Sequence, residues 1–244
     1  MQGNQLWVVM PVYNEEASVG RVLDEWVTVL RQTVGSFTVF AVNDGSKDRT
    51  AQQLEDYRKQ CPELEILHKP NTGHGQSCVE GYRRAVEGGA EWILQIDSDG
   101  QCNAEYFAKF WQARDTFPVV FGYRKKREDG FARWLISRFV SVFTWAATGY
   151  WLRDANVPYR LMRRDYLQRA LPLIPPTMYL ANILLSVLLK RGSDILWVPI
   201  VFRERIGGSP SLKAFSFVKH GYRLFIQLKE AMRQAQWNEP IGKA

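Results

Sequence analysis

The sequence predicts a three-layer α/β fold in which helices cover a mostly parallel central β-sheet. Short apolar runs alternate with helix-like segments through residues 1–123, and this alternation is typical of βαβ units with right-handed crossovers. The chain has 244 residues, 46% of them hydrophobic and 23% charged, which suits one large core. Polar clusters follow several of the apolar runs, at the sheet edge where open α/β folds bind ligands.

In the first half, strands are expected where short apolar runs occur, at Leu6–Pro11, Phe37–Asn43, Leu64–His68, Glu91–Ile96 and Pro118–Tyr123. Helices are expected between them at Glu16–Leu30, Asp48–Gln60, Gly75–Val86 and Ala104–Trp111. In the first of these helices the apolar residues recur at helical spacing, at Val19, Val22, Leu23, Trp26, Val27 and Leu30. The third helix follows a Gly-x-Gly turn.

Beyond Tyr123 the pattern changes to longer helices. Helices are expected at Phe131–Tyr150, Met178–Arg191 and Phe215–Arg233, and strands at Pro158–Arg163 and Ile195–Phe202. The first and last of these helices mix aromatic with basic residues, which fits a helix lying in a membrane interface and equally a helix packed on a core. No linker or repeat divides the sequence, so we expect a single domain over residues 1–244.

Charge and cysteine content restrict the class of protein. The net charge of +7 favours a polyanionic partner such as nucleic acid, anionic lipid or a phosphorylated substrate. Cys61, Cys78 and Cys102 lack CxxC spacing, which indicates reduced thiols in a cytosolic setting. Met1–Leu6 lacks the features of a signal peptide, and no uncharged apolar run approaches the roughly 20 residues that span a bilayer. We expect a protein that is soluble or lies on a membrane surface.

Three polar clusters follow the first, second and fourth expected strands: Pro11–Glu15 (PVYNE), Asn43–Thr50 (NDGSKDRT) and Asp97–Gln101 (DSDGQ). Taken singly, each would also suit a turn or the start of a helix. Because the carboxyl ends of parallel strands share one edge, we expect the clusters to converge on one crevice. Two carboxylates one residue apart, with an amide nearby, suit a hard divalent cation that carries a diphosphate.

Together these motifs resemble those of the inverting family 2 glycosyltransferases, which have the GT-A fold. PVYNE, VNDGSxDxT, NxGxG and DxD occur in that family's order. The nucleotide-sugar-binding residues that the resemblance implies are Pro11, Tyr13, Glu15, Asp44 and Asp97. The ligands that it implies for Mg²⁺ or Mn²⁺ are Asp97, Asp99 and Gln101. Residues 1–123 would bind a UDP- or GDP-linked sugar, and residues 124–244 would bind the acceptor.

The acceptor class follows from a missing base. Many family 2 enzymes that glycosylate a sugar hydroxyl carry a Glu-Asp pair before their late helix, and its Asp deprotonates the acceptor. The corresponding stretch here, Pro176–Leu184 (PTMYLANIL), has no carboxylate. A hydroxyl nucleophile needs such a base at neutral pH, whereas a phosphate monoester is already an anion. The sequence therefore favours a phosphate acceptor.

Arginines of the second half resemble those of polyprenyl-phosphate glycosyltransferases, the group that includes dolichyl-phosphate mannose synthase. The segments Gly122–Arg138 and Phe202–Ser209 carry this resemblance. The acceptor-phosphate residues that it implies are Arg124, Arg133, Ser137 and Arg138. Arg205 would contact the donor diphosphate, so the implied catalytic set is Asp99, Arg124 and Arg205.

The resemblance implies metal-dependent transfer of a sugar, with inversion, to undecaprenyl or dolichyl phosphate. Such a protein would be cytoplasmic and peripheral to the cytoplasmic face of the membrane. The candidate assemblies of such a protein are a complex with a separate membrane-anchoring subunit and a homo-oligomer.

Other functions compete with this interpretation. A soluble glycosyltransferase acting on a saccharide hydroxyl in cell-envelope polysaccharide synthesis would be supported by a base near Asn182 or Asp154. A nucleic-acid-binding protein would suit the positive charge, but no recognised nucleic-acid motif occurs, so no nucleic-acid partner is expected. A nucleotide-binding scaffold without turnover is a third class, and the two aspartates of the third cluster argue against it.

Overall fold

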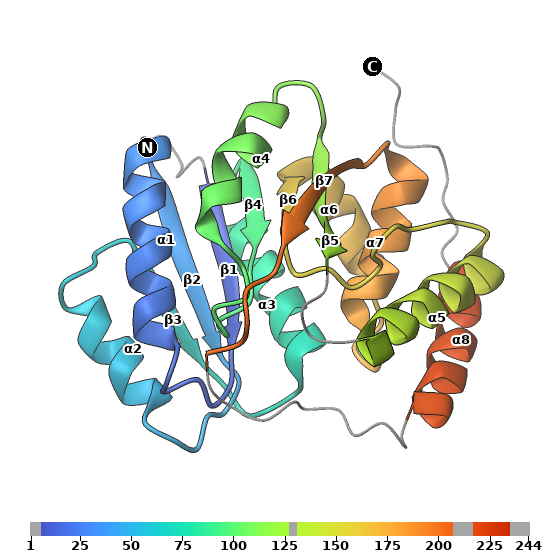
Figure 1. The fold of residues 1–244 in the computed structure, drawn as a ribbon, viewed down its shortest axis with the longest axis horizontal. Helices are drawn as coiled ribbons and strands as arrows, with labels where there is room; N and C mark the ends of the chain where they lie inside the picture. The colour runs from blue at the N-terminus through green and yellow to red at the C-terminus, as the bar shows by residue number, and fades with distance from the viewer. Residues whose placement is uncertain (1–5, 127–130, 207–216, 235–244) are drawn as a thin grey trace.

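The computed structural model of the chain describes residues 6–126, 131–206 and 217–234. Seven strands form one sheet in the order β3-β2-β1-β4-β6-β5-β7 (Figure 1). Their bounds are β1 Leu6–Val12, β2 Phe37–Asn43, β3 Leu64–His68, β4 Trp92–Gln95, β5 Val119–Lys126, β6 Arg160–Arg163 and β7 Leu196–Val201. β6 is antiparallel to its neighbours β4 and β5, and the other pairings are parallel. Strands from both halves of the chain therefore share one sheet.

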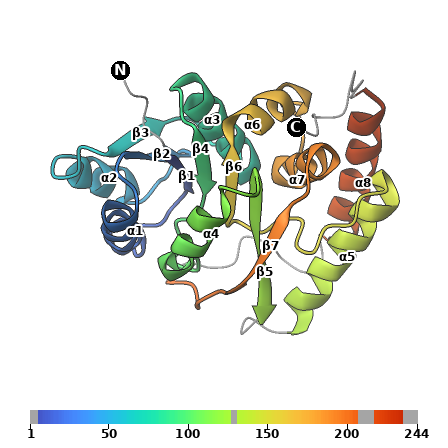
Figure 2. The ribbon, with the colours of Figure 1, turned by 90° about the horizontal axis from the view of Figure 1, so that it is seen from above.

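Helices cover both faces of this sheet. Their bounds are α1 Val19–Thr33, α2 Thr50–Arg58, α3 His74–Glu87, α4 Phe107–Ala113, α5 Phe131–Thr148, α6 Arg164–Ala170, α7 Ala181–Gly192 and α8 Phe217–Gln234. The view from above shows α1, α2 and α4 on one face and α3, α6 and α7 on the other (Figure 2). α5 and α8 pack against each other beside α7 (Figure 1). β1 and β2 are buried along their whole length, as expected of parallel strands covered on both faces.

α3 lies close against the sheet, and this approach depends on a glycine. A Cβ on Gly81 would lie 2.3 Å from Cγ1 of Val9, a distance that real side chains do not adopt. The missing side chain lets α3 rest across β1 and β2. The close contact fixes where the N-terminus of α3, at His74, meets the carboxyl ends of these strands.

The predicted fold class is confirmed, and β2 and β3 have the predicted bounds. The sequence did not predict α6, because its seven residues are too few to establish a helical period and follow directly on β6. Within the parts of the chain that the structure describes, no helix combines the length and apolarity needed to cross a bilayer.

Candidate active site

The three polar clusters lie at one edge of the sheet. β1, β2 and β4 are parallel, so the segments that follow them leave the sheet together. Two hydrogen bonds of 2.9 Å join these segments: the N–H of Asp44 donates to the carbonyl of Val12, and the hydroxyl of Ser98 donates to the carbonyl of Pro11. Tyr13, in the first cluster, is 43% exposed at this edge. An exposed aromatic ring here can stack on a planar ligand.

Asp44 is buried and holds the loop that precedes α3. Its carboxylate accepts hydrogen bonds from the Lys69 ammonium at 2.5 Å and from the N–H groups of Thr72 at 2.8 Å and Gly73 at 2.9 Å. Burial alone would raise the pKa of Asp44, but the Lys69 ammonium and the Thr72 N–H outweigh burial and lower it. Asp44 therefore stays ionised and shapes the loop that precedes α3. Sequence reasoning did not identify Lys69, because its partner is 25 residues away.

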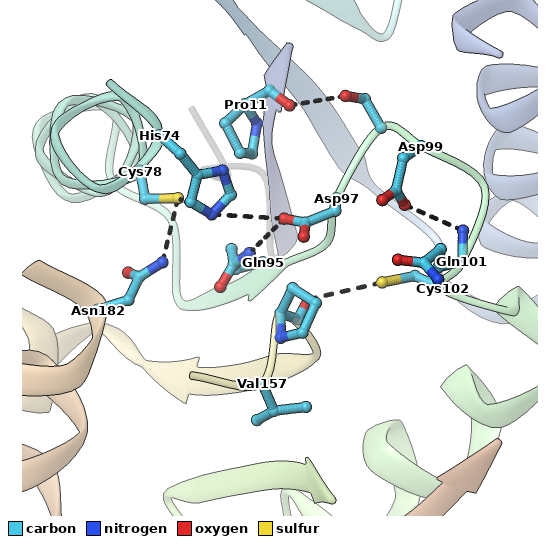
Figure 3. A network of polar contacts seen from close by, with 12 residues as sticks. Pro11, His74, Cys78, Gln95, Asp97, Asp99, Gln101, Cys102, Val157 and Asn182 are labelled. Carbon is cyan, nitrogen blue, oxygen red and sulfur yellow. Dashed lines mark hydrogen bonds and ion pairs between the residues drawn. The ribbon is translucent and has the colours of Figure 1, made fainter. Parts of the chain in front are cut away.

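Asp97, Asp99 and Gln101 share the loop after β4 (Figure 3). Oδ1 of Asp99 accepts a hydrogen bond of 3.1 Å from the N–H of Gln101. Oδ1 of Asp97 accepts one of 3.1 Å from Nε2 of Gln95 and lies 3.6 Å from Nε2 of His74. Burial raises the pKa of Asp97 to about 6, a rise that His74 opposes and Asp99 increases. The two aspartates thus repel each other in a partly desolvated corner.

The segment after β7 runs along this loop. The N–H groups of Arg203 and Ile206 donate to the carbonyls of Gln101 at 3.2 Å and Asp99 at 3.1 Å. Gly100 lies between these carbonyls with a φ of 80°, and a Cβ there would come within 2.5 Å of Ile206. The glycine is required by both the backbone conformation and the close contact. The contact brings residues 203–206 beside the loop that carries the aspartates.

Arg205 lies between the first and third clusters. Its Nη2 donates to Oε1 of Glu15, and its Nη1 lies 3.9 Å from Oδ2 of Asp99. Glu15 also accepts a hydrogen bond of 2.8 Å from the hydroxyl of Ser18. Burial raises the pKa of Glu15, while the Ser18 hydroxyl and the Arg205 guanidinium oppose the rise. The predicted residues Glu15, Asp99 and Arg205 therefore form one connected group.

The chemistry of the aspartate corner fits a divalent cation. The negative charge of Asp99 raises the pKa of Asp97, and a cation between them would relieve that repulsion. No group of three or more His, Cys, Asp or Glu side chains that could hold a metal occurs among the described residues. Mg²⁺ commonly takes one or two carboxylates from a protein and completes its coordination with substrate phosphates. Asp97 and Asp99 would hold the ion, with Gln101 as the third predicted ligand. Nε2 of Gln101 donates to the carbonyl of Arg203 at 3.1 Å, so its amide oxygen is the atom that would face the ion.

Arg124 lies in β5 and is paired with a buried carboxylate. Its Nε and Nη2 donate to the two oxygens of Asp154, each at 2.7 Å. The Asp154 side chain is 8% exposed and that of Arg124 is 19% exposed. The guanidinium also lies 5.4 Å from the ring centre of Phe202. The surrounding protein therefore holds Arg124 in one orientation.

The other predicted acceptor residues belong to α5. Arg138 is exposed on this helix. The side chains of Arg133 and Ser137 lie outside the described residues, so their predicted role stays a prediction.

Asn182 and Asp154 mark the places near which a base for a hydroxyl acceptor would lie, and neither side chain is itself available as a base. Asn182 is 3% exposed; its Oδ1 accepts from the Tyr82 hydroxyl at 3.2 Å, and its Nδ2 donates to the Cys78 sulfur at 3.3 Å. Both oxygens of Asp154 accept from Arg124. A carboxylate in a bidentate pair with arginine is a weak base, because the guanidinium stabilises its charged form.

A buried arginine beside this region was not predicted. Arg160 is fully buried and donates to the carbonyls of Val157 at 2.6 Å, Asn182 at 2.8 Å and Ala155 at 3.0 Å. These bonds tie the segment after Asp154 to the first turn of α7. No sequence signal marks such a residue, because arginine is usually exposed.

Comparisons with known proteins show what this chain is similar to. The model of the family described as "Glycosyl transferase family 2" matches residues 7–171. The undecaprenyl-phosphate mannosyltransferase of Micrococcus luteus is 29% identical over 208 residues, which are 81% of this chain and 83% of that protein. The undecaprenyl-phosphate 4-deoxy-4-formamido-L-arabinose transferase of Proteus mirabilis is 26% identical over 171 residues, which are 69% of this chain and 52% of that protein. The chain thus spans about half the length of the second relative.

Solved structures show the same fold. Glucosyl-3-phosphoglycerate synthase from Mycobacterium tuberculosis in complex with phosphoglyceric acid superposes with a TM-score of 0.66 at 17% identity, over 93% of this chain and 81% of that one. The same enzyme in complex with Mn²⁺ and UDP-glucose gives a TM-score of 0.62 at 14% identity, over 93% of this chain and 80% of that one.

Proposed function

The chain belongs to glycosyl transferase family 2 and is a glycosyltransferase with the GT-A fold, and from that premise we propose that it transfers a sugar from a nucleotide diphosphate sugar to a polyprenyl phosphate. The observation that carries the proposal is the likeness to an undecaprenyl-phosphate mannosyltransferase over 81% of the chain. The lack of a carboxylate in Thr177–Ile183 supports it independently, because a phosphate acceptor needs no base.

On the donor side, the first 123 residues would bind the nucleotide sugar. Tyr13 would stack on the base. The loop Asn71–Gly73, which the Asp44 carboxylate holds by hydrogen bonds, would lie beneath the nucleotide. A bound Mg²⁺ or Mn²⁺ would neutralise the leaving diphosphate. Asp97, Asp99 and Gln101 would hold that ion. The Arg205 guanidinium, 3.9 Å from Asp99, would contact a diphosphate oxygen.

On the acceptor side, residues 124–244 would bind the lipid phosphate. Donor diphosphate and acceptor phosphate are both anions, so they repel each other unless cations lie between them. Arg124 would meet the acceptor phosphate, with Arg133, Ser137 and Arg138 of α5 beside it. A phosphate oxygen then attacks the anomeric carbon opposite the leaving diphosphate, which inverts its configuration.

The donor half is tested by thermal unfolding in the presence of UDP- and GDP-sugars, with Mn²⁺ or with EDTA. A ligand at 100 times its dissociation constant adds about 2.7 kcal/mol to the free energy of unfolding. We expect one nucleotide class to raise the melting temperature in Mn²⁺ and to do so far less in EDTA. Equal stabilisation in EDTA would contradict the metal site, and no stabilisation by any nucleotide sugar would contradict the donor assignment.

The helices α5 and α8 support a proposal that the protein lies on a membrane surface. Together they expose large apolar side chains: Phe139, Val142, Phe143 and Trp145 on α5, and Tyr222 and Ile226 on α8. Exposed basic residues accompany them: Arg138, Arg223 and Lys229. Apolar side chains that enter the headgroup region, flanked by cations that attract anionic lipid, are typical of interfacial helices. A lipid phosphate acceptor would be reached from the same surface.

Vesicle flotation tests this surface. We expect the protein to float with vesicles that contain phosphatidylglycerol and less with vesicles of phosphatidylcholine alone. The double variant Phe139→Ser and Trp145→Ser should weaken vesicle binding by about 10-fold or more, because each aromatic side chain contributes roughly 1.5–3 kcal/mol when buried. Flotation of this variant at the wild-type level would contradict the membrane surface at α5.

A further inference from the structure

A chain of hydrogen bonds leads from α7 to the predicted metal ligand Asp97. Gln95 is fully buried at the end of β4. Its Nε2 donates to Oδ1 of Asp97 at 3.1 Å, and its Oε1 accepts from the Tyr82 hydroxyl at 3.2 Å. The same hydroxyl lies 3.2 Å from Oδ1 of Asn182. Gln95, Asp97 and Asn182 are labelled in Figure 3.

Packing alone does not explain Gln95. The other residues of β4 are Trp92, Ile93 and Leu94, all buried, and a strand that is buried on both faces usually continues as an apolar run. A buried amide costs free energy unless both its oxygen and its nitrogen are hydrogen-bonded. The polar side chain at this position is therefore explained by what it contacts.

Asp97 sets the direction of the Gln95 amide, and Tyr82 matches it. An ionised carboxylate can only accept hydrogen bonds, so the NH₂ group of Gln95 faces Oδ1 of Asp97. The amide oxygen of Gln95 then faces the Tyr82 hydroxyl, whose single hydrogen lies between the amide oxygens of Gln95 and Asn182.

The two carboxylate oxygens of Asp97 have different surroundings. Oδ1 is held by Gln95 and lies 3.6 Å from Nε2 of His74. Within the described part of the chain, Oδ2 accepts no hydrogen bond. We propose that Gln95 is a positioning residue that fixes the rotation of the Asp97 carboxylate and so presents Oδ2 to the donor-bound cation. This inference rests on the proposed metal-dependent donor site.

The inference is tested by Mn²⁺ titration of thermal stability in the presence of the matching nucleoside diphosphate, UDP or GDP. Gln95→Met keeps the length of the side chain but removes the hydrogen bond. We expect it to raise the Mn²⁺ concentration for half-maximal stabilisation by about 10-fold or more, the range typical when a residue that orients a metal ligand is lost. Tyr82→Phe should shift that concentration in the same direction by a smaller factor.

A matched control is Tyr159→Phe. Tyr159 is also fully buried, but its hydroxyl has no hydrogen-bond partner among the described residues, so its removal should leave the Mn²⁺ midpoint unchanged. If Gln95→Met and Tyr82→Phe lower only the melting temperature and keep the wild-type Mn²⁺ midpoint, Gln95 has a structural role and the inference fails. If Gln95→Met does not fold, the Mn²⁺ midpoint of Tyr82→Phe tests the inference by itself. If the proposed function itself is wrong, the result is different: Mn²⁺ and nucleotide do not stabilise even the wild-type protein.

Discussion

An Asp99→Ala enzyme is expected to lose about 100- to 1,000-fold in turnover, the usual effect of removing one group that stabilises charge in a transition state. It should also lose the Mn²⁺ enhancement of nucleotide binding. The reason is that the carboxylates of Asp97 and Asp99, in the loop after β4, would hold the cation. Without Asp99, the single carboxylate of Asp97 would bind a hard ion only weakly. Initial rates and Mn²⁺ titrations of nucleotide binding measure the two effects.

The Asp99 variant needs a control for the shape of the loop, because Oδ1 of Asp99 also accepts from the N–H of Gln101 at 3.1 Å. Asp99→Asn keeps an oxygen for this hydrogen bond and removes the charge, so it should resemble Asp99→Ala if charge is what matters. Asp56→Ala removes an exposed carboxylate of α2 that is paired with Lys59 and should leave turnover unchanged. Normal activity of Asp99→Ala with the metal still required would show that Asp99 is not a metal ligand.

Arg124→Ala is expected to affect both stability and acceptor use. The variant removes the bidentate pair between Arg124 and the buried Asp154, and breaking a buried ion pair typically costs about 3–5 kcal/mol. Removing the guanidinium should also raise the KM for polyprenyl phosphate while the affinity for the donor nucleotide changes little. Urea unfolding and steady-state kinetics with each substrate varied in turn measure the two effects.

Asp154→Asn separates these effects. It weakens the same pair but keeps the Arg124 guanidinium, so we expect it to lose stability and to retain most of its acceptor affinity. If both variants raise the KM for the acceptor equally, Arg124 acts through the structure of the loop and does not bind the phosphate.

The positions of the three polar clusters could be predicted because they depend on strand direction. Pro11–Glu15, Asn43–Thr50 and Asp97–Gln101 each follow a buried apolar run, and parallel strands present their carboxyl ends at one edge. The periodicity that identified α1 is likewise local, since its buried residues Val19, Val22, Leu23, Trp26, Val27 and Leu30 are those that the spacing selects.

The partners within the site could not be predicted, because they are set by tertiary packing. Arg124 pairs with Asp154 across 30 residues, Arg205 with Glu15 across 190, and Tyr82 with Asn182 across 100. Sequence spacing carries no information on such contacts. The consequence for function is specific: Arg124 was predicted as a phosphate ligand, and the structure adds that a buried carboxylate orients it.

The central claim is that the acceptor is a phosphate that needs no protein base, and acceptor choice tests it most directly. The purified protein would be offered undecaprenyl phosphate, undecaprenol and free saccharides in the same detergent, with Mn²⁺ and the donor found by thermal unfolding. Undecaprenol shares the lipid of the phosphate but presents a hydroxyl, so it isolates the contribution of the anionic nucleophile. We expect transfer to undecaprenyl phosphate alone, with inverted anomeric configuration in the product. Transfer to a saccharide hydroxyl with none to the lipid phosphate would contradict the account and favour a soluble saccharide glycosyltransferase.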